Sequence, residues 1–466
     1  MHLPRNFVIV LFLISVLAVP QAFAQSASPD AEPTALTLAQ AIEISLAHNL
    51  GLEGAQYQRQ AARWAMWYSV AGYLPNASFN TSYTRLDPET VDNANQGVKR
   101  SGDMAEAFGI ELNLEPSAFE DNYSSNITVV QPIFNGGAEI AAIRLARAAS
   151  KQSDLAYDEQ MLSTVRDTKT AYFQVMQASA LKQVSQDGLA LATETLRLFQ
   201  AQYEVGQVSR SDVLRWEAQA AQAEGSMIEA ESAYELSMIA LAEVLGSDLA
   251  TRYIMPKLEL SIDPQLQQAV RAELDELSTS EQIDELIADH PAIKGIEQSV
   301  KMQCSNVQLA WATILPKLNF AYNYSWPTDD DLHLNGDESW TAMLQLEVPL
   351  FTGLRGVTGI GRERRNLHLA RVEQQQFQRS FVQQVYAARL QLDTALRKLE
   401  AARKQVDFAE ENLRNMQGRS EVGMASNLEL LDAQVTYNGA RSDLVRAVSD
   451  YYIALSLWEY IQARRY

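Results

Sequence analysis

The chain has 466 residues, of which 47% are hydrophobic and 21% charged, a balance typical of folded rather than disordered proteins. Its formal net charge of −20 argues against a nucleic-acid-binding protein, because nucleic acid selects basic surfaces. Its single cysteine, Cys304, excludes an intrachain disulfide framework, and we expect it to be an inert helix residue.

The first segment predicts export from the cytoplasm. His2 and Arg5 precede an apolar run over residues 7–19, and Ala22-Phe23-Ala24 has the small-x-small pattern of a secretory cleavage site. We therefore interpret residues 1–24 as a cleaved signal peptide, with an uncleaved anchor as the alternative. No later stretch approaches ~18 consecutive apolar residues, so the sequence predicts no transmembrane helix in the mature chain.

The remainder of the chain is an internal duplication of one structural unit. Residues 43–83 match residues 284–324 at an offset of 241, and later segments match at 217, for example Pro132-Ile133-Phe134 with Pro349-Leu350-Phe351. The difference of 24 residues places an insertion in the first repeat between Thr84 and Gln131. We assign the first repeat to residues 25–275 and the second to residues 276–466.

Each repeat opens with a predicted helix, over about residues 37–72 and 280–314, and each helix is ended by Leu-Pro. A β-hairpin follows, over residues 76–131 in the first repeat and 317–348 in the second. Its strands alternate apolar or aromatic residues on one face with polar residues on the other. Strands of about ten residues with this alternation are typical of an outer-membrane barrel wall, although a soluble sheet with one wet face shows the same period.

Aromatic residues are frequent near the predicted loop of each hairpin, which favours the membrane because such rings lie at its interfaces. We interpret the following as membrane-interface aromatics: Tyr83, Tyr322, Tyr324, Trp326 and Trp340. We expect residues 86–122 and 327–339 to be long, solvated polar loops. The acidic spacing in the second does not fit a calcium loop of the EF-hand type.

Two very long helices follow, over about residues 137–204 and 354–421. Neither contains proline, their apolar residues recur at near-heptad spacing, and ~68 helical residues would reach ~100 Å. Each ends in the same turn. Gly206 and Gly423 suit a left-handed residue after a helix, and Ser209 and Ser426 begin the returning helix as N-caps.

The capping boxes are completed by Asp212 and Glu429, three residues after each N-cap. The returning helices, about residues 212–245 and 429–464, complete two helical hairpins over residues 137–246 and 354–464.

The alternation of the strands and the near-heptad spacing of the long helices together constrain the assembly. Four strands cannot close a membrane barrel, since the smallest have about eight, and lipid does not tolerate an open sheet edge. The chain must therefore oligomerise, and three copies would supply twelve strands. Helices of ~100 Å exceed the bilayer thickness several-fold, so they must project from it as a coiled-coil tube. A barrel continuous with such a tube is a duct.

The chain resembles the TolC-like outer-membrane efflux factor family over essentially its whole mature length. The resemblance rests on several short segments in the family's order: residues 36–42, Leu74-Pro75, residues 131–137 and the two hairpin tips. It implies an α+β membrane protein, a homotrimer with a twelve-stranded β-barrel in the outer membrane of a Gram-negative bacterium and a helical tunnel in the periplasm. It also implies a periplasmic adaptor and an inner-membrane pump of the RND, ABC or MFS type as partners, outer-membrane lipid around the barrel, and no cofactor. The function that it implies is a passive exit duct for efflux or type I secretion.

The resemblance also assigns roles at the hairpin tips. Glu429 and Asp432 match acidic residues that narrow the periplasmic entrance, and Asp212 matches an aspartate of its closing links. The alternative is that these acids only cap their helices. The adaptor-docking tips match Val205, Gly206, Ser209, Val422, Gly423 and Ser426.

One feature departs from the family pattern. The tyrosine and arginine expected opposite Asp212 are replaced by Ser420 and Ala425, and Arg419 or Arg210 are candidate substitutes.

Nothing in the sequence supports catalysis. The five histidines are scattered, no paired Cys/His spacing indicates a metal site, and no phosphate-binding loop is present, so we expect neither an enzyme nor a metalloprotein. Two other functions remain open at this point. One is a periplasmic coiled-coil scaffold with a soluble β-sheet, and the other is a stand-alone porin, which would need more strands and no long helices.

Overall fold

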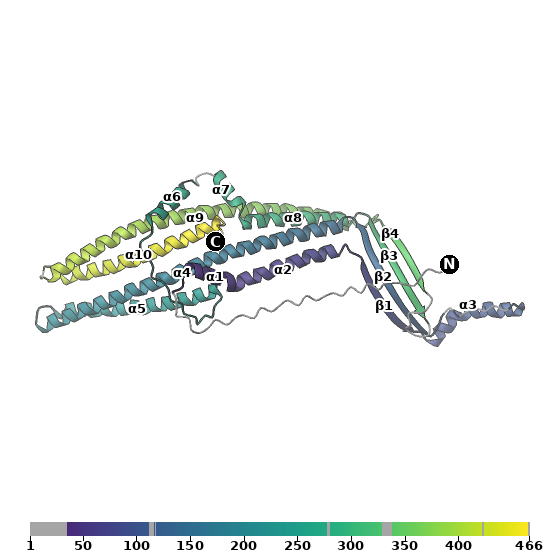
Figure 1. Cartoon of the computed structure of the whole chain (residues 1–466), viewed down its shortest axis with the longest axis horizontal. Helices are drawn as coiled ribbons and strands as arrows, with labels where there is room; N and C mark the ends of the chain where they lie inside the picture. Colours follow the sequence, from purple (N-terminus) through teal and green to yellow (C-terminus); the bar gives the residue numbers. More distant parts are fainter. Residues whose placement is uncertain are drawn as a thin grey trace.

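The computed structural model describes residues 35–110, 116, 118–276, 280–328, 338–421 and 424–464. The predicted signal peptide therefore lies outside the described residues. The chain is elongated, with the sheet toward one end and two helical hairpins extending to the other (Figure 1).

Both repeats contain the predicted elements in the predicted order. The first comprises α1 (Leu38–His48), α2 (Leu50–Ala71), β1 (Asn76–Arg85), α3 (Pro88–Ala107), β2 (Asp121–Asn135), α4 (Ala138–Glu204) and α5 (Arg210–Leu245). The segment after α5, which we call the connector, contains α6 (Pro264–Glu276) and leads into the second repeat. The second repeat comprises α7 (Ser280–Ala288), α8 (Pro291–Ala312), β3 (Lys317–Thr328), β4 (Ser339–Glu347), α9 (Arg355–Glu421) and α10 (Asn427–Ile461). The long helices α4 and α9 have 67 residues each, which confirms the ~100 Å length expected from the sequence.

The opening helix of each repeat is broken once, so the prediction of one continuous helix was wrong. Asn49 is extended and its side chain accepts a hydrogen bond from the Leu52 amide at 3.1 Å, which ends α1 and caps α2. The equivalent residue, His290, caps α8 by accepting from the Ala292 amide at 3.2 Å. A polar side chain that bonds to the nearby backbone competes with the helix, and the duplication has kept this break in both copies.

The first break brings α1 close to the end of α5. Ser45 Oγ and Asn49 Nδ2 donate to the Val244 carbonyl at 3.1 and 2.9 Å. Gly246 ends α5 in the left-handed conformation (φ +68°), and a Cβ there would lie 2.1 Å from the His48 carbonyl oxygen. Only glycine allows this approach of the two backbones.

The four strands form one antiparallel sheet in the order β1-β2-β3-β4. The pairings Phe79–Ile127, Ile127–Tyr324 and Tyr324–Trp340 put the apolar faces of both repeats on the same side. The opposite side carries polar rows such as the pairings Asn80–Asn126, Asn126–Ser325 and Ser325–Ser339. The alternation predicted from the sequence is confirmed, and β2 continues four residues further than expected, through a bulge at residues 132–134.

The insertion of the first repeat contains a helix, α3, where we expected a solvated loop. Asp87 accepts from the Thr90 amide at 3.0 Å, and Pro88 occupies the first turn. The Asp-Pro-Glu-Thr run is therefore a helix-start signal that the loop prediction overlooked. Asn95 ties α3 to the segment before β2 by hydrogen bonds in both directions with the Ala118 backbone. The helix extends beyond the end of the sheet (Figure 1). Of the second expected loop, residues 329–337 lie outside the described part of the chain.

The apolar core lies where the repeats meet, in the middle of the helical part. One cluster joins α9 and α10 to the connector and includes Leu392, Tyr451 and Trp458, all fully buried. A second joins α4, α5 and the start of the chain, around Val175, Leu241 and Leu245.

We predict that Gly246→Ala destabilises the fold more than Gly206→Ala. Both positions have positive φ, so each substitution costs about 1–2 kcal/mol for the left-handed conformation. Only the Cβ at residue 246 also collides with backbone, so thermal unfolding followed by circular dichroism should show the larger loss there. Equal losses would contradict the close approach of α5 to His48.

Candidate functional site

In the residues that the structure describes, the far ends of the two helical hairpins share the same closing hydrogen bond. At the first tip, Gly206 is left-handed (φ +77°), and the Gln207 amide donates to the Gln202 carbonyl at 2.9 Å. This is the hydrogen bond that closes a helix end of the Schellman type. At the second tip the equivalent bond joins the Met424 amide and the Arg419 carbonyl at 2.7 Å. The predicted tip residues Val422 and Gly423 lie outside the described residues.

Both predicted capping boxes are present. Ser209 Oγ accepts from the Asp212 amide at 3.3 Å, and Asp212 accepts from the Ser209 amide at 3.1 Å. In the second copy Ser426 Oγ accepts from the Glu429 amide at 3.3 Å, and Glu429 accepts from the Ser426 amide at 2.7 Å. Each box pairs two backbone N–H groups that a helix start leaves without a partner.

These contacts keep the two carboxylates charged. Hydrogen bonds from Ser209 and then from Asn427 lower the pKa of Asp212 below its usual range. The Ser426 backbone and side chain lower the pKa of Glu429, with help from the charge of Arg419. Asp432 is exposed one turn further along α10, on the same side of the helix as Glu429. The second tip therefore presents two neighbouring acidic side chains.

One polar contact links the two tips directly. The side chain of Asn427, at the start of α10, lies beside Asp212, at the start of α5, and lowers the pKa of its carboxyl. Arg419, considered as a substitute lock residue, donates to the Met424 carbonyl of its own tip at 3.0 Å. Asp212 thus has a partner on the other hairpin that the sequence pattern did not reveal.

A small apolar core holds the hairpins together behind the tips. Phe199 and Trp216 of the first hairpin stack with ring centroids 5.6 Å apart, and they pack against Leu413, Leu430 and Ala433 of the second. Trp216 is 1% exposed. The tips consequently form one joint surface.

Apolar side chains project from this surface. Val205, predicted from the sequence, is exposed, and so are Leu214, Met424 and Leu428, which were not predicted. A large apolar side chain beside a polar helix start has no partner to pack against within its own turn. In the sequence, this position was the signal that could have indicated an exposed apolar surface.

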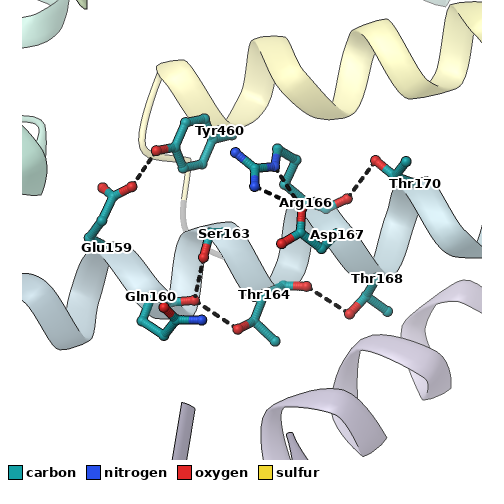
Figure 2. Close-up of polar contacts among 9 residues, drawn as sticks. All are labelled: Glu159, Gln160, Ser163, Thr164, Arg166, Asp167, Thr168, Thr170 and Tyr460. Atoms are coloured by element: carbon teal, nitrogen blue, oxygen red, sulfur yellow. Dashed lines mark hydrogen bonds and ion pairs between the residues drawn. The ribbon is translucent and has the colours of Figure 1, made fainter. Parts of the chain in front are cut away.

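Further back, polar contacts join α4 to α10. Arg441 pairs with Asp187 at 2.8 Å, and the buried Lys169 pairs with Glu459 at 2.5 Å. Figure 2 shows the neighbouring group, in which the Tyr460 hydroxyl donates to Glu159 and Arg166 pairs with Asp167. Burial and the Glu159 hydrogen bond raise the pKa of Tyr460, so its hydroxyl keeps its proton at neutral pH. The Arg441–Asp187, Lys169–Glu459 and Tyr460–Glu159 contacts connect one repeat to the other.

At the opposite end of the chain, the predicted interface aromatics lie together on the apolar face of the sheet. Tyr83 packs on Tyr123 with centroids 4.9 Å apart, and Tyr322 stacks on Trp340 at 6.3 Å. Tyr324 meets Trp326 edge-on at 4.6 Å. The cluster occupies the half of the sheet that is remote from the helical hairpins.

Two features of the described residues bear on other functions. No group of three or more His, Cys, Asp and Glu side chains is arranged to hold a metal ion in this part of the chain. Within the same residues, no helix has the length and apolar character needed to cross a membrane.

Comparison with known proteins identifies the family. The model of the outer membrane efflux protein family matches residues 41–247 and 282–456, which is most of both repeats. The chain belongs to the outer membrane efflux protein family.

Several named proteins are similar to this chain in sequence. The chain is 24% identical over 348 residues to Protein CyaE of Bordetella pertussis, covering 72% of this chain and 67% of that protein. It is 23% identical over 391 residues to Outer membrane efflux protein BepC of Brucella suis, covering 83% and 82%. Alkaline protease secretion protein AprF of Pseudomonas aeruginosa is 23% identical over 72% of this chain and 68% of its own length.

Solved structures show the same fold. The CmeC outer membrane channel of Campylobacter jejuni superposes with a TM-score of 0.76 at 16% identity, covering 96% of this chain and 93% of that chain. The outer membrane protein VceC of Vibrio cholerae gives 0.75 at 16% identity, covering 91% and 96%. The predicted TolC-like fold is confirmed.

The family assignment confirms the predicted function, an exit duct in the outer membrane, with the helical part in the periplasm. It decides against the periplasmic scaffold and the stand-alone porin. The family consists of channel and transport proteins rather than enzymes.

We predict that Ser426→Ala loosens the second tip. Loss of an N-cap costs about 1 kcal/mol, so hydrogen exchange of the Glu429 amide should accelerate about fivefold. Ser442→Ala, on the same helix away from the tip, is the control.

The effect of Glu429→Gln on hydrogen exchange at the second tip should depend on pH. Because the folded-state pKa of Glu429 is depressed, its charge stabilises the tip above the ordinary value of 4.5, and this is lost as pH falls through the lowered pKa. The difference in tip exchange between wild type and Glu429→Gln should therefore shrink below pH 4.5. A difference independent of pH would contradict the assigned contact.

Proposed function

We propose that the protein works as a homotrimer that forms the outer-membrane exit of a tripartite export system, together with a periplasmic adaptor and an inner-membrane pump. One observation carries the proposal. Within its described residues a single chain supplies a four-stranded sheet whose two outer strands are each paired on one side, and this sheet is continuous with two hairpins of ~100 Å.

The strand count supports assembly from identical copies. Within the described residues β1 and β4 each pair on one side only. In a four-stranded antiparallel sheet β4 runs opposite to β1, so β4 of one copy can continue antiparallel into β1 of the next. Three copies give twelve strands, which closes a barrel and removes the edges that lipid would not tolerate.

The joint tip surface supports docking of an adaptor. It exposes Val205, Leu214, Met424 and Leu428 around two polar turns at the end farthest from the sheet. Apolar side chains with a polar rim are typical of protein–protein contact sites. Gly206, Ser209 and Ser426 shape the described turns that carry these side chains, and the sequence assigns Val422 and Gly423 the same role.

We further propose that Glu429 and Asp432 line the periplasmic entrance. Glu429 and Asp432 are both exposed, and the depressed pKa of Glu429 keeps that carboxylate ionised. Threefold repetition would multiply this negative charge around one axis and favour cations. Asp212 and Asn427 act as the link that holds the hairpins of one copy together, in place of the missing tyrosine and arginine.

The cargo class follows from the partners. AprF is named for alkaline protease secretion and BepC for efflux, so relatives of similar identity serve both kinds of export. We propose that the pump and adaptor, rather than this chain, select the cargo.

Gene deletion tests the function. Loss of the protein should raise sensitivity to several drugs, dyes or metals, or abolish export of a secreted protein, and the wild-type gene should restore it. Unchanged sensitivity together with normal protein and metabolite export would reject the proposal.

Complementation with variants then tests the tip. Val205→Asp should fail to complement and should lose copurification with the adaptor, because a charge replaces an apolar contact. Phe108→Asp, at an equally exposed position just after α3, should complement fully.

The entrance is tested by single-channel conductance. Glu429→Gln with Asp432→Asn should weaken block by multivalent cations added from the periplasmic side, by roughly tenfold at low salt, since the effect is electrostatic. Asp92→Asn on α3 is the control. Identical block in the double variant would remove both residues from the entrance.

A further inference from the structure

The charge of the helical part changes sign along its length. The seventeen residues nearest the sheet in each of α2, α4, α8 and α9 contain eleven Lys or Arg and four Asp or Glu. The seventeen residues nearest the tips in each of α4, α5, α9 and α10 contain six Lys or Arg and twelve Asp or Glu. A chain with a formal net charge of −20 therefore has a positively charged band, about 25 Å long, beside the sheet.

Most acidic side chains of this band are already bonded to neighbours. The three pairs are Glu139 with Asn135, Asp154 with Arg63 at 3.0 Å and Glu363 with Arg362 at 2.8 Å. Among the described residues, no carboxylate lies within ion-pair distance of Arg144, Arg147 or Arg364, which are all exposed. These three positive charges are therefore free to bind a partner outside the chain.

The same three arginines lie around one tryptophan, on three adjacent helices. Arg144 of α4 donates to Gln308 of α8 at 3.1 Å. Trp311, one turn further along α8, has the guanidinium of Arg364 of α9 over its ring, 5.5 Å from the centroid. Arg147 follows Arg144 by three residues, so the two share a side of α4. Trp311 is 41% exposed. We call Arg144, Arg147, Trp311 and Arg364 the basic patch.

The basic patch lies on the side of the helices that carries the connector. Glu400 of α9 pairs with Arg271 of α6, and Arg364 precedes Glu400 by 36 residues, which is about ten helical turns. Trp311 follows Ile293 by 18 residues, about five turns, and Ile293 belongs to the apolar cluster that includes the connector. The connector would obstruct a duct if it lay inside, so this side is the outside of the tube.

This outer surface is complete within one chain. Helix α8 packs against α4 on one side and against α9 on the other, and Figure 1 shows it between them. The basic patch therefore does not depend on how copies of the chain assemble.

The sheet places the basic patch at the level of the lipid headgroups. Strand β3 has 12 residues, about 40 Å when extended, and the tilt of about 35–45° usual in membrane barrels shortens this to about 30 Å. That is the thickness of the hydrocarbon core of a bilayer. Trp311 lies just beyond the sheet, near the end of α8, where the headgroups begin. Tryptophan and arginine side chains at this level are typical of a membrane interface.

The chemistry of the basic patch suits a phospholipid with net negative charge. Guanidinium groups bind phosphate through paired N–H donors, and an indole ring packs well where apolar and polar lipid groups meet. A zwitterionic headgroup carries its own cation beside the phosphate, which competes with the arginines. A free phosphate would leave Trp311 without a contact.

We propose that the basic patch binds the phosphate of anionic phospholipids in the leaflet of the outer membrane that faces the periplasm. Arg144 and Arg147 hold the headgroup from α4 and Arg364 holds it from α9, while Trp311 packs against its glycerol esters. The apolar face of the sheet leads directly into the basic patch, so the acyl chains of the same lipid can lie on the strands. The bound lipids fix the height of the channel in the membrane, and this role is independent of the adaptor and the pump.

Lipid retention tests the site. The purified protein is exchanged into detergent with equal amounts of phosphatidylglycerol and phosphatidylcholine, and the bound lipids are counted by native mass spectrometry. Wild type should retain phosphatidylglycerol preferentially, and less so as salt is added. Arg144→Gln, Arg147→Gln and Arg364→Gln should each weaken this retention about fivefold, and the triple variant should lose the preference. Trp311→Ala should lower the retention of both lipids.

A matched triple variant is the control. Arg197→Gln, Arg397→Gln and Arg414→Gln remove the same charge at exposed positions far from the sheet, and together they should leave the preference unchanged. Thermal unfolding should be alike in both triple variants, because all six side chains are exposed. A wild-type preference in the patch variant, or an equal loss in both triple variants, would overturn the proposal.

Two further measurements separate other occupants. Inorganic phosphate in large excess should not displace phosphatidylglycerol from wild type, and displacement would make the basic patch a site for free anions instead. Wild type and the triple patch variant should sediment equally with purified peptidoglycan. Loss of sedimentation in the variant, with lipid retention unchanged, would assign the basic patch to the cell wall and refute the lipid site.

Discussion

The structure depends on the need to pair backbone hydrogen-bonding groups where no water is present. A sheet in lipid cannot leave an edge open, and in the part of the chain that the structure describes β1 and β4 each have one open edge. In the proposed trimer, twelve strands from three copies satisfy that need. The same strands lead directly into α2, α4, α8 and α9, so closing the barrel also arranges the helices in a ring.

The helical part is held by a different kind of interaction. The α4–α10 boundary contains ion pairs and hydrogen bonds as well as apolar contacts, and Lys169 is nearly fully buried beside Glu459. Removing one partner of such a pair leaves a buried charge uncompensated, which costs several kcal/mol. These contacts favour one alignment of the two repeats over others displaced along the helices. The alignment in turn brings Asp212 of the first tip next to Asn427 of the second.

The sequence was most informative where a local rule acts alone. Alternation placed β1 at residues 76–85, as observed, and the absence of proline predicted 67-residue helices within one residue at each end. It was less informative where one polar side chain competes with the helix. The break at Asn49 was missed because one capping side chain sets it, and the break at His290 was missed although Pro291, in the first turn of α8, marks a helix start. Helix α3 was missed because its polar composition resembles a loop.

The tips show the same division between local and distant causes. Gly206, Ser209 and Ser426 could be assigned because a turn and a cap involve residues only three or four apart. The Asp212–Asn427 link and the Phe199–Trp216 core could not, since neither is specified by a local turn or capping rule.

By itself, then, the sequence determined the duplication, the strand faces, the helix lengths and the turn chemistry, because each depends on neighbours along the chain. Only the tertiary structure decided which sides of the repeats are covered and which stay free. That choice depends on how α8 and α10 pack across two repeats more than a hundred residues apart, and no periodicity of the sequence indicates this packing.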